Sequence, residues 1–384
     1  MKVKKILVIF TLTLILSSGC QGSEVPDLIF SIGLGIDWKE NQIELTSEFI
    51  KPAPTEENSS EKGSSVIFTS QGRTLGEASN SLSNFLPQTP LWSHVSIVML
   101  SENLCQTDVA LVADYLTRTT EIKHNIPLLV ISGSSPEEIF KTKPVLEPYI
   151  STSLALTLQN EEKQLNIYKP VLMYEFMRKL IAPGIEPVLP QIKKTTDGEK
   201  DILFLDGVAV FKGQKMIASL NEAESQGYNY LTNKNITSGL LLINNPDDPQ
   251  YFITFELTKL LVEIQPLIEK ENNRITMLIQ VHADGNFYEQ SGSGDVLRLD
   301  KYPQLEQMVE DKINAYISNC IDRVQIINSD ILGWGQLINQ KDPHFWEQVS
   351  PQWDMIFPTI NYQTQSDFVI RRTYLTRKSY YFQE

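Results

Sequence analysis

The stretch ILFLDGVAVFKGQKMIASL, residues 202–220, carries the clearest β-hairpin pattern in the chain. Two strand-like apolar runs flank Lys212, Gly213 and Gln214, a polar group typical of a hairpin turn. With residues 228–235, YNYLTNKN, the hairpin forms a small unit that we place at residues 159–243. The segments on either side of this middle domain define the rest of the fold.

The residues before the hairpin alternate between strand and helix patterns. LIFSIGLGIDW and NQIELTSEFIKP predict two strands around the turn 39–41, and Thr74 with Glu77 matches a capping box at a helix start. HVSIVML (94–100) and IPLLVIS (126–132) predict buried strands, and a further helix begins near Pro136. One face of the helix between these strands carries Leu104, Val109, Val112 and Leu116. We therefore expect an N-terminal α+β domain over residues 28–158.

The residues after the hairpin predict a separate C-terminal domain. Two prolines and two aspartates in NNPDDPQ, residues 244–250, indicate a linker. YFITFELT, RITMLIQVHA and SDFVIRRTYLT are strand-like, and a long helix is expected from Pro303 to Ile321. Residues 251–384 are thus a third unit, and the predicted fold class is α+β, with three domains of mixed sheets and helices.

The first nineteen residues have the pattern of an export signal. MKVKK is a positive start, and ILVIFTLTLIL (6–16) is an apolar run of eleven residues. A membrane-spanning helix needs about twenty apolar residues, and no other window of the chain approaches that length. We expect residues 1–19 to be a signal peptide and the mature chain to be water-soluble apart from any anchor.

Cys20 stands where the apolar run gives way to polar residues. Ser17, Ser18 and Gly19 precede it, which resembles a bacterial lipobox, where the signal is cut before the cysteine and the cysteine carries the lipid. Lipoboxes usually have Leu, Val or Ile where Ser17 stands, so an ordinary signal peptide with a chance cysteine is the alternative. A lipidated Cys20 would make residues 20–27 a tether, because acyl chains contribute about 0.8 kcal/mol per buried methylene to membrane binding.

The charge and the remaining cysteines exclude several protein classes. The 384 residues include 33 Lys and Arg against 47 Asp and Glu, a net charge of −14, which becomes −17 when three lysines leave with the signal. This charge repels phosphate backbones, so we expect no nucleic-acid partner. Cys105 and Cys320 are too few for a disulfide framework. Cys320 falls on the apolar stripe of Leu305, Val309, Ile313 and Ile317, which favours a buried, inert thiol.

No catalytic or metal-binding constellation emerges from the sequence. The four histidines, His94, His124, His282 and His344, have no metal-ligand spacing. We find no G-x-S-x-G, no H-E-x-x-H and no P-loop lysine. We therefore predict no catalytic residues, no metal and no cofactor.

Two glycine-containing motifs invite a ligand interpretation that the spacing does not support. Gly33 and Gly35 lack the third glycine of a dinucleotide fingerprint, and Asp37 leads into a turn, so these glycines favour close packing or a bulge. In SDILGWG, Asp330 can cap a helix start while Gly333 and Gly335 let the helix approach the sheet. Trp346 and Trp353 lie seven residues apart, which favours a core stripe over a ligand platform.

Several motifs together, in order and spacing, resemble the Ger(x)C spore-germination lipoproteins, the C subunits of nutrient germinant receptors. These motifs are DLIFSIGLGIDW (27–38), SQGRTLGEASNSLS (70–83), HVSIVMLSENL (94–104), LDGVAVFKGQKMIASLNEAESQGYNYL (205–231) and SDILGWGQLINQKDPHFWEQVSPQWDMIFP (329–358). The resemblance covers nearly all of the chain after the signal, and the last block is its most specific part.

The resemblance implies a three-domain α+β lipoprotein on the outer face of the spore inner membrane, beside integral-membrane A and B subunits, without catalytic residues. Two departures from the family pattern are Gln21-Gly22, where the family commonly has Trp-Asp, and Trp334, where it tends to have Phe. By position, the family's residues correspond here to Cys20 for lipidation and to Gly33, Gly35, Asp37, Gly207, Phe211, Lys212, Asp330, Gly333, Gly335, Pro343 and Trp346 as structural signature positions.

Three functions follow, from different classes. The leading hypothesis is a lipid-anchored receptor subunit that is needed for the germination response through assembly with the A and B subunits. The alternative is a solute-binding lipoprotein that captures the nutrient directly, which requires a cleft with convergent polar groups. An exported enzyme has the least support, because no nucleophile, base or metal set is present in the sequence.

Overall fold

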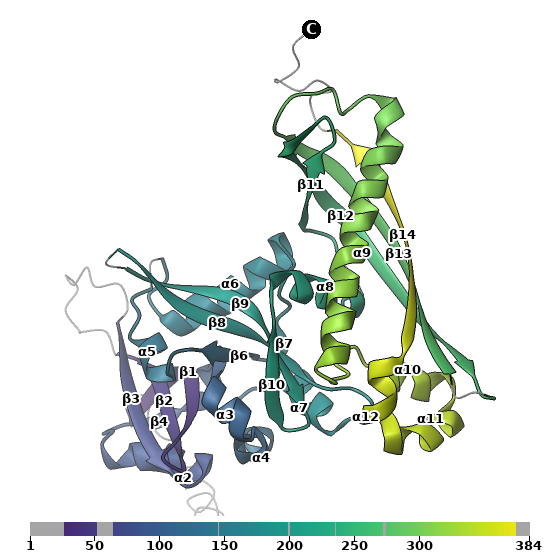
Figure 1. Ribbon diagram of the computed structural model, residues 1–384. Coiled ribbons are helices and arrows are strands. Elements are labelled where there is room, and N and C mark those ends of the chain that lie inside the picture. The colour runs from purple at the N-terminus through teal and green to yellow at the C-terminus, as the bar shows by residue number, and fades with distance from the viewer. Residues whose placement is uncertain are drawn as a thin grey trace, which may run out of the picture.

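The structure is a computed structural model that describes residues 27–51, 64–144, 146–198, 200–234, 236–271 and 274–373. Its strands form two sheets, one of ten strands and one of four (Figure 1). The mixture of helices and sheets confirms the α+β class. The predicted signal peptide and Cys20 lie outside the described residues.

The ten-stranded sheet has a parallel centre and antiparallel edges. Its order is β10-β9-β8-β6-β5-β1-β2-β3, with β4 paired to β1 and β7 to β6. Neighbours among β1, β5, β6 and β8 are parallel, so their amino ends lie at one edge of the sheet. The strands are β1 (Leu28–Lys39), β2 (Gln42–Ile50), β3 (Ser65–Gly72), β4 (Thr89–Leu91), β5 (Val98–Ser101), β6 (Pro127–Ser132), β7 (Val171–Leu172), β8 (Val188–Asp197), β9 (Lys200–Lys212) and β10 (Lys215–Leu220).

Helices cover both faces of this sheet, because its central strands are apolar on both sides. One buried cluster joins the sheet to α2, α3, α4 and α7, and a second joins the other face to α5 and α6. The helices are α2 (Leu75–Ser81), α3 (Glu102–Thr107), α4 (Ala110–Arg118), α5 (Pro136–Phe140), α6 (Ile150–Gln164) and α7 (Met173–Ile181), with 3-10 turns η2 (Leu82–Asn84) and η3 (Trp92–His94).

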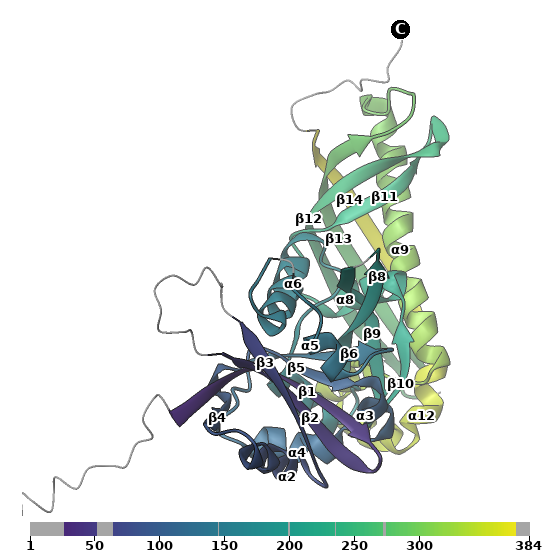
Figure 2. The ribbon, with the colours of Figure 1, turned by 90° about the vertical axis from the view of Figure 1, so that its left-hand side faces the viewer.

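The four-stranded sheet, in the order β11-β12-β13-β14, packs against the long helix α9 (Figures 1 and 2). Buried residues recur along α9 at helical spacing, including Cys320 on the predicted stripe. The elements are α8 (Glu222–Thr232), β11 (Leu240–Asn245), β12 (Asp248–Glu269), β13 (Arg274–Gln290), η4 (Leu299–Lys301), α9 (Tyr302–Ile326), α10 (Trp334–Lys341), α11 (Pro343–Val349), η5 (Ser350–Gln352), α12 (Trp353–Ile356), η6 (Phe357–Thr359) and β14 (Asn361–Arg372).

The structure corrects several predicted element boundaries. Residues 244–250 are not a linker: they form the turn of the β11–β12 hairpin, where Asn245 pairs with Asp248. The hairpin at residues 202–220 is confirmed as β9–β10, but it belongs to the ten-stranded sheet, so the middle segment has no sheet of its own. Helix α6 runs across the predicted boundary at residue 158, and α9 extends five residues beyond Ile321.

Smaller predictions also need adjustment. The helix predicted after HVSIVML is two helices, α3 and α4, interrupted at Asp108, although its four apolar residues are all buried. The strand expected from His94 starts only at Val98, because residues 92–94 form a 3-10 turn. At Thr74 half of the capping box is present: the hydroxyl accepts from the N–H of Glu77, whose carboxylate instead accepts from the N–H of Arg73.

Two glycines of β1 allow helices to lie directly on the strand. A Cβ atom at Gly33 would overlap Ser151 of α6, and one at Gly35 would overlap Pro136 of α5. The buried Glu48 of β2 fixes the same helix, because its carboxylate accepts from the backbone N–H of Ser151 at 2.9 Å and from its hydroxyl at 2.6 Å. Close approach and a capped helix end therefore hold α6 against the sheet.

The two sheets are joined at a turn around Asp330, which is buried. Its carboxylate accepts from the backbone N–H groups of Trp334 at 2.9 Å and Gly335 at 2.8 Å, the first two residues of α10, as predicted for a helix cap. The indole N–H of Trp353 donates to it at 3.1 Å. Burial raises the pKa of Asp330 to about 7, against the opposing effect of these donors.

Backbone meets backbone at this turn. A Cβ atom at Gly335 would lie 2.7 Å from Cα of Gly184 and 2.7 Å from the ring of Trp346. Two hydrogen bonds cross the same contact, from Gln336 N–H to Gly184 C=O at 3.0 Å and from Glu186 N–H to Asp330 C=O at 2.9 Å. We refer to residues 184–186 and 330–336 as the joint.

Replacing Gly335 by Ala should destabilise the protein by about 1–3 kcal/mol, because the added methyl group has no space between Gly184 and Trp346. Gly76→Ala is the matched control, since Gly76 lies in α2 with only the Tyr115 ring within contact distance, and Ala favours helix by about 1 kcal/mol. Urea unfolding followed by circular dichroism checks both variants. Equal stability of Gly335→Ala and wild type would contradict the close contact.

Asp330→Asn should destabilise the protein by about 1–3 kcal/mol at pH 5, because an amide has one acceptor oxygen for three buried N–H donors. Between the ordinary pKa of 3.8 and the raised value of about 7, the folded wild type binds one more proton than the unfolded chain. Wild-type stability therefore falls as pH rises through this range, whereas Asn cannot titrate. The difference between the two proteins should shrink from pH 5 to pH 8.

Asp342→Asn is the control for this pH dependence. Hydrogen bonding to Lys270 lowers the pKa of Asp342, so its folded and unfolded values both lie below pH 5. The stability difference between this variant and wild type should be the same at pH 5 and pH 8. A difference for Asp330→Asn that grows with pH would show that the carboxylate is stabilised as an anion.

Candidate functional site

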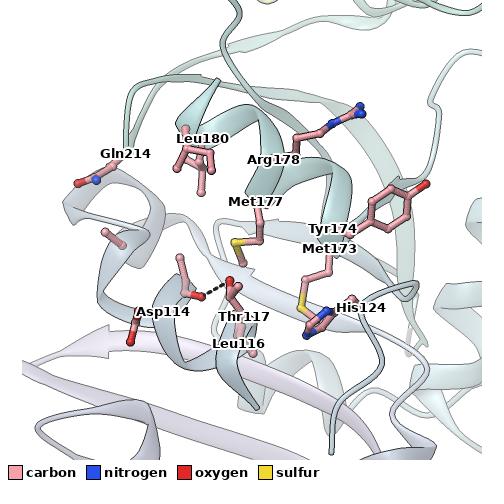
Figure 3. A pocket seen from close by; sticks show the side chains of 13 residues that line it. Asp114, Leu116, Thr117, His124, Met173, Tyr174, Met177, Arg178, Leu180 and Gln214 are labelled. Atoms are coloured by element: carbon pink, nitrogen blue, oxygen red, sulfur yellow. Dashed lines mark hydrogen bonds between the residues drawn. The ribbon is translucent and has the colours of Figure 1, made fainter. Parts of the chain in front are cut away.

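An apolar groove with a volume of about 560 Å³ lies between α4 and α7 (Figure 3). Met177 of α7 extends toward α4, and Met173 lies beside His124 at the base of the groove (Figure 3). We call this feature the α4–α7 groove. Its lining residues are Ala110, Ala113, Asp114, Leu116, Thr117, His124, Met173, Tyr174, Met177, Arg178, Leu180, Ile181 and Gln214.

The sequence of α7, MYEFMRKLI, explains why the groove is apolar. Met173 and Phe176 are buried on the sheet, while Met177 and Leu180 are only partly buried, on the side toward α4. Ile181 ends the helix with 86% of its surface exposed, and Tyr174 is 46% exposed. An exposed isoleucine beside a concave apolar surface is typical of an interaction site.

Charged residues line the rims of the groove. On α4, Asp114 pairs with Arg118 at 2.7 Å. On α7, Arg178 is exposed and forms no ion pair with any residue that the structure describes, and its side chain points away from α4 (Figure 3). Arg178 also lines a second hollow on the other side of α7.

This second hollow is a basic recess of about 200 Å³ between α7, the β8–β9 pair and α8. Lys169, Arg178 and Lys179 line it with one carboxylate, Glu175. Lys179 Nζ donates to the hydroxyl of Tyr228 at 3.4 Å and has no ion pair among the described residues. The remaining walls are apolar, formed by Ile167, Pro170, Val171, Val188, Pro190 and Val208.

A third, open hollow lies where the parallel strands β1, β5 and β6 end, but its polar groups already serve local structure. Asp37 accepts hydrogen bonds from the hydroxyl of Ser101 and from the N–H of Trp38. Ser101 and Ser135 cap the starts of α3 and α5. In the part of the chain that the structure describes, no group of three or more His, Cys, Asp or Glu could hold a metal ion.

The two described cysteines are buried, and two of the histidines lie beside carboxylates. Burial raises the pKa of the Cys105 and Cys320 thiols, so neither is a ready nucleophile. His282 lies 2.5 Å from Asp367, and His344 lies 3.4 Å from Glu347, both at exposed positions. None of these residues lines the groove or the recess.

The structure places the signature residues in three regions, β1, β9 and the segment around the joint, and none of them lines the groove or the recess. Gly33, Gly35 and Asp37 belong to β1 and lie under α5, α6 and α3. Gly207 of β9 has a φ of 91°, and a Cβ atom there would overlap the carbonyl oxygen of Leu220. The joint contains Asp330, Gly333 and Gly335, and Trp346 packs against it, with its ring centre 5.1 Å from that of Trp353.

The groove residues Arg178 and Ile181 were not singled out in the sequence. Their only signal is the position of Ile181 at the end of an amphipathic stretch, where an apolar residue without a buried neighbour is unexpected. Nothing in the sequence distinguishes Glu48 from Glu44 and Thr46, the polar residues at the alternate positions before it in the same strand. These roles depend on packing between segments far apart in the chain.

Among the described residues, no helix is both long and apolar enough to cross a membrane.

Comparison with known proteins identifies the family. Residues 21–194 match the model "Spore germination protein N-terminal domain", and residues 206–374 match "Spore germination B3/ GerAC like, C-terminal". The chain is 23% identical to "Putative spore germination protein YfkR" of Bacillus subtilis (strain 168), covering 83% of this chain and 84% of that protein. It is also 23% identical to "Spore germination protein B3" of the same organism, covering 95% of this chain and 96% of that protein.

A solved structure shares the fold. "Crystal Structure of the GerBC protein" superposes with a TM-score of 0.53 at 20% identity, over 88% of this chain and 96% of that chain. The two family models together span nearly all of the described residues. The chain belongs to the Ger(x)C family of spore germination proteins.

Proposed function

We propose that this protein is the lipid-anchored C subunit of a spore nutrient germinant receptor, which acts by assembly with integral-membrane A and B subunits. The observation that carries the proposal is the match of both halves of the chain, residues 21–194 and 206–374, to germination-protein models. The described residues support a binding role, since they offer a groove and a recess without an assembled catalytic or metal-binding set.

Cys20 would tie the protein to the outer face of the spore inner membrane. Residues 20–27 would span at most about 29 Å when fully extended, at about 3.6 Å per residue. The strand β1 begins at Leu28, at the edge of the sheet that holds the amino ends of the parallel strands. A lipid on Cys20 would therefore keep the start of β1 close to the bilayer.

Anchoring supplies the mechanism of assembly. A subunit restricted to the membrane surface meets the A and B subunits at an effective concentration far above that of a freely diffusing protein. In this role the subunit contributes binding surfaces to the receptor, and the germination response needs the subunit because the receptor is incomplete without it.

The basic recess favours a second candidate, a lipoprotein that captures the nutrient directly. Its lysines could hold a carboxylate, Glu175 could hold an ammonium, and its apolar walls could hold a side chain.

Replacing Cys20 by Ala should release the protein from membranes, because no acyl chain can then be attached. More than about tenfold less protein should sediment with spore membranes, and spores should germinate slowly in amino acids or sugars, measured as loss of optical density. Ser23→Ala is the control, since it alters the same segment without removing the cysteine. A Cys20→Ala protein that still sediments and still supports germination would refute the lipid-anchored role.

Calorimetry distinguishes direct capture of the nutrient from a role in receptor assembly alone. If the recess captures nutrients, amino acids should release or absorb heat on titration into the detergent-solubilised full chain, and Lys179→Met should weaken binding at least about tenfold by removing a partly buried charge. Lys200→Met, in the β8–β9 hairpin outside the recess, is the control. Absence of heat with every germinant tested would exclude direct capture.

A further inference from the structure

The α4–α7 groove has the properties of a binding surface for a helix. Two helices of nine residues each form its walls, and the partly buried Met177 between them can adapt to the shape of an inserted side chain. Ile181, with 86% of its surface exposed, and Tyr174, with 46%, add exposed apolar surface to the lining of the groove. Exposed apolar area of this kind gains free energy when a partner covers it.

The charge on the groove rim selects among partners. Arg178 is exposed, lies on the α7 rim and has no ion pair within the described part of the chain. On the opposite rim, Asp114 is already paired with Arg118. A carboxylate on the partner would therefore complement Arg178, and a basic residue would find no free acid in return.

The groove also lies near the expected membrane side. The first turn of α7 is attached to the residues before β6, because the N–H groups of Met173 and Tyr174 donate to the carbonyls of Ile126 and His124 at 2.9 and 3.0 Å. These residues are at the amino edge of the parallel strands, the same edge at which β1 begins. An anchor at Cys20 would hold Leu28, the first residue of β1, within about 29 Å of the bilayer, on this same side of the sheet.

We propose that the α4–α7 groove receives an amphipathic helix of an integral-membrane receptor subunit, which lies at the bilayer surface and places an acidic side chain opposite Arg178. The inference rests on the proposed function, since the anchor sets which partners the groove can meet. The apolar face of the partner helix enters between α4 and α7 and covers Ile181. The lipid surface itself is a poor occupant, because the anchored chain, with a net charge of −17 once the three signal lysines are removed, is repelled by anionic headgroups.

The first test measures assembly. Full-length chain is co-expressed with a tagged A subunit and the B subunit, and the amount of chain recovered per A subunit is measured after detergent extraction. Ile181→Gln and Arg178→Glu should each lower recovery by about tenfold or more, because they remove buried apolar area or reverse the complementary charge. Arg178→Lys should retain most of it.

Matched controls make the same changes elsewhere. Leu299→Gln alters an apolar residue that is 81% exposed in η4, and Lys200→Glu reverses a charge on the β8–β9 hairpin. Both should assemble like wild type. Circular dichroism and thermal unfolding of every variant should match wild type, since all four positions are exposed.

The second test identifies the occupant. A photo-crosslinking amino acid replaces Tyr174 on the groove rim, and the product is mapped by mass spectrometry. Attachment to a segment of the A or B subunit with apolar residues at i, i+3, i+4 and i+7 and an acidic residue on its flank supports the proposal. Attachment to a segment without that pattern overturns it.

The remaining outcomes distinguish a failure of the groove proposal from a failure of the proposed receptor function. If wild type and all groove variants are recovered in equal amounts, the groove is not the binding surface, and the proposed receptor role is unaffected. Wild type that fails to co-purify with the A subunit would overturn both. Loss of binding to protein-free phosphatidylglycerol vesicles in Ile181→Gln, or loss of a dimer in that variant, would make the occupant a lipid surface or a second copy and would also overturn the proposal.

Discussion

The architecture depends on a contact in which two backbones meet without side chains between them. Gly184 follows α7, Gly335 begins α10, and a Cβ atom on either would overlap the other segment. The carboxylate of Asp330 holds the start of α10, and the hydroxyl of Ser329 donates to the carbonyl of Phe211 at 2.6 Å. Together these contacts fix the C-terminal sheet and its helices against the edge of the ten-stranded sheet, so the two sheets form one continuous structure.

Burial also removes Asp330 and the two described cysteines from solvent. Asp330 has a raised pKa, a property often found in catalytic acids, yet its carboxylate accepts from the start of α10 and from the indole of Trp353. The two described cysteines are equally inaccessible. The surfaces that remain accessible on α7 are an apolar groove on one side and a basic recess on the other, with Arg178 between them.

Local patterns in the sequence predicted the elements well and their assembly poorly. The β9–β10 hairpin and the stripe of α9 follow from periodicity alone, and both are confirmed. The Pro-Asp-Asp-Pro segment looked like a linker because a tight hairpin turn and a linker use the same residues, and only strand pairing distinguishes them. The groove could not be predicted, because the exposure of Ile181 depends on how α4 packs beside α7.

Helix α7 is short, so it links the amino edge of the ten-stranded sheet directly to the joint. It begins at the amino edge of the sheet, where an anchored chain would face the membrane, and Ile181 ends it only three residues before Gly184. A short rigid helix transmits a displacement of one end to the other, and the contact of Gly184 with Gly335 has no side chain that could absorb it. A partner seated against α7, as proposed above, would therefore contact the same helix that leads into the joint and, through the joint, to the C-terminal sheet.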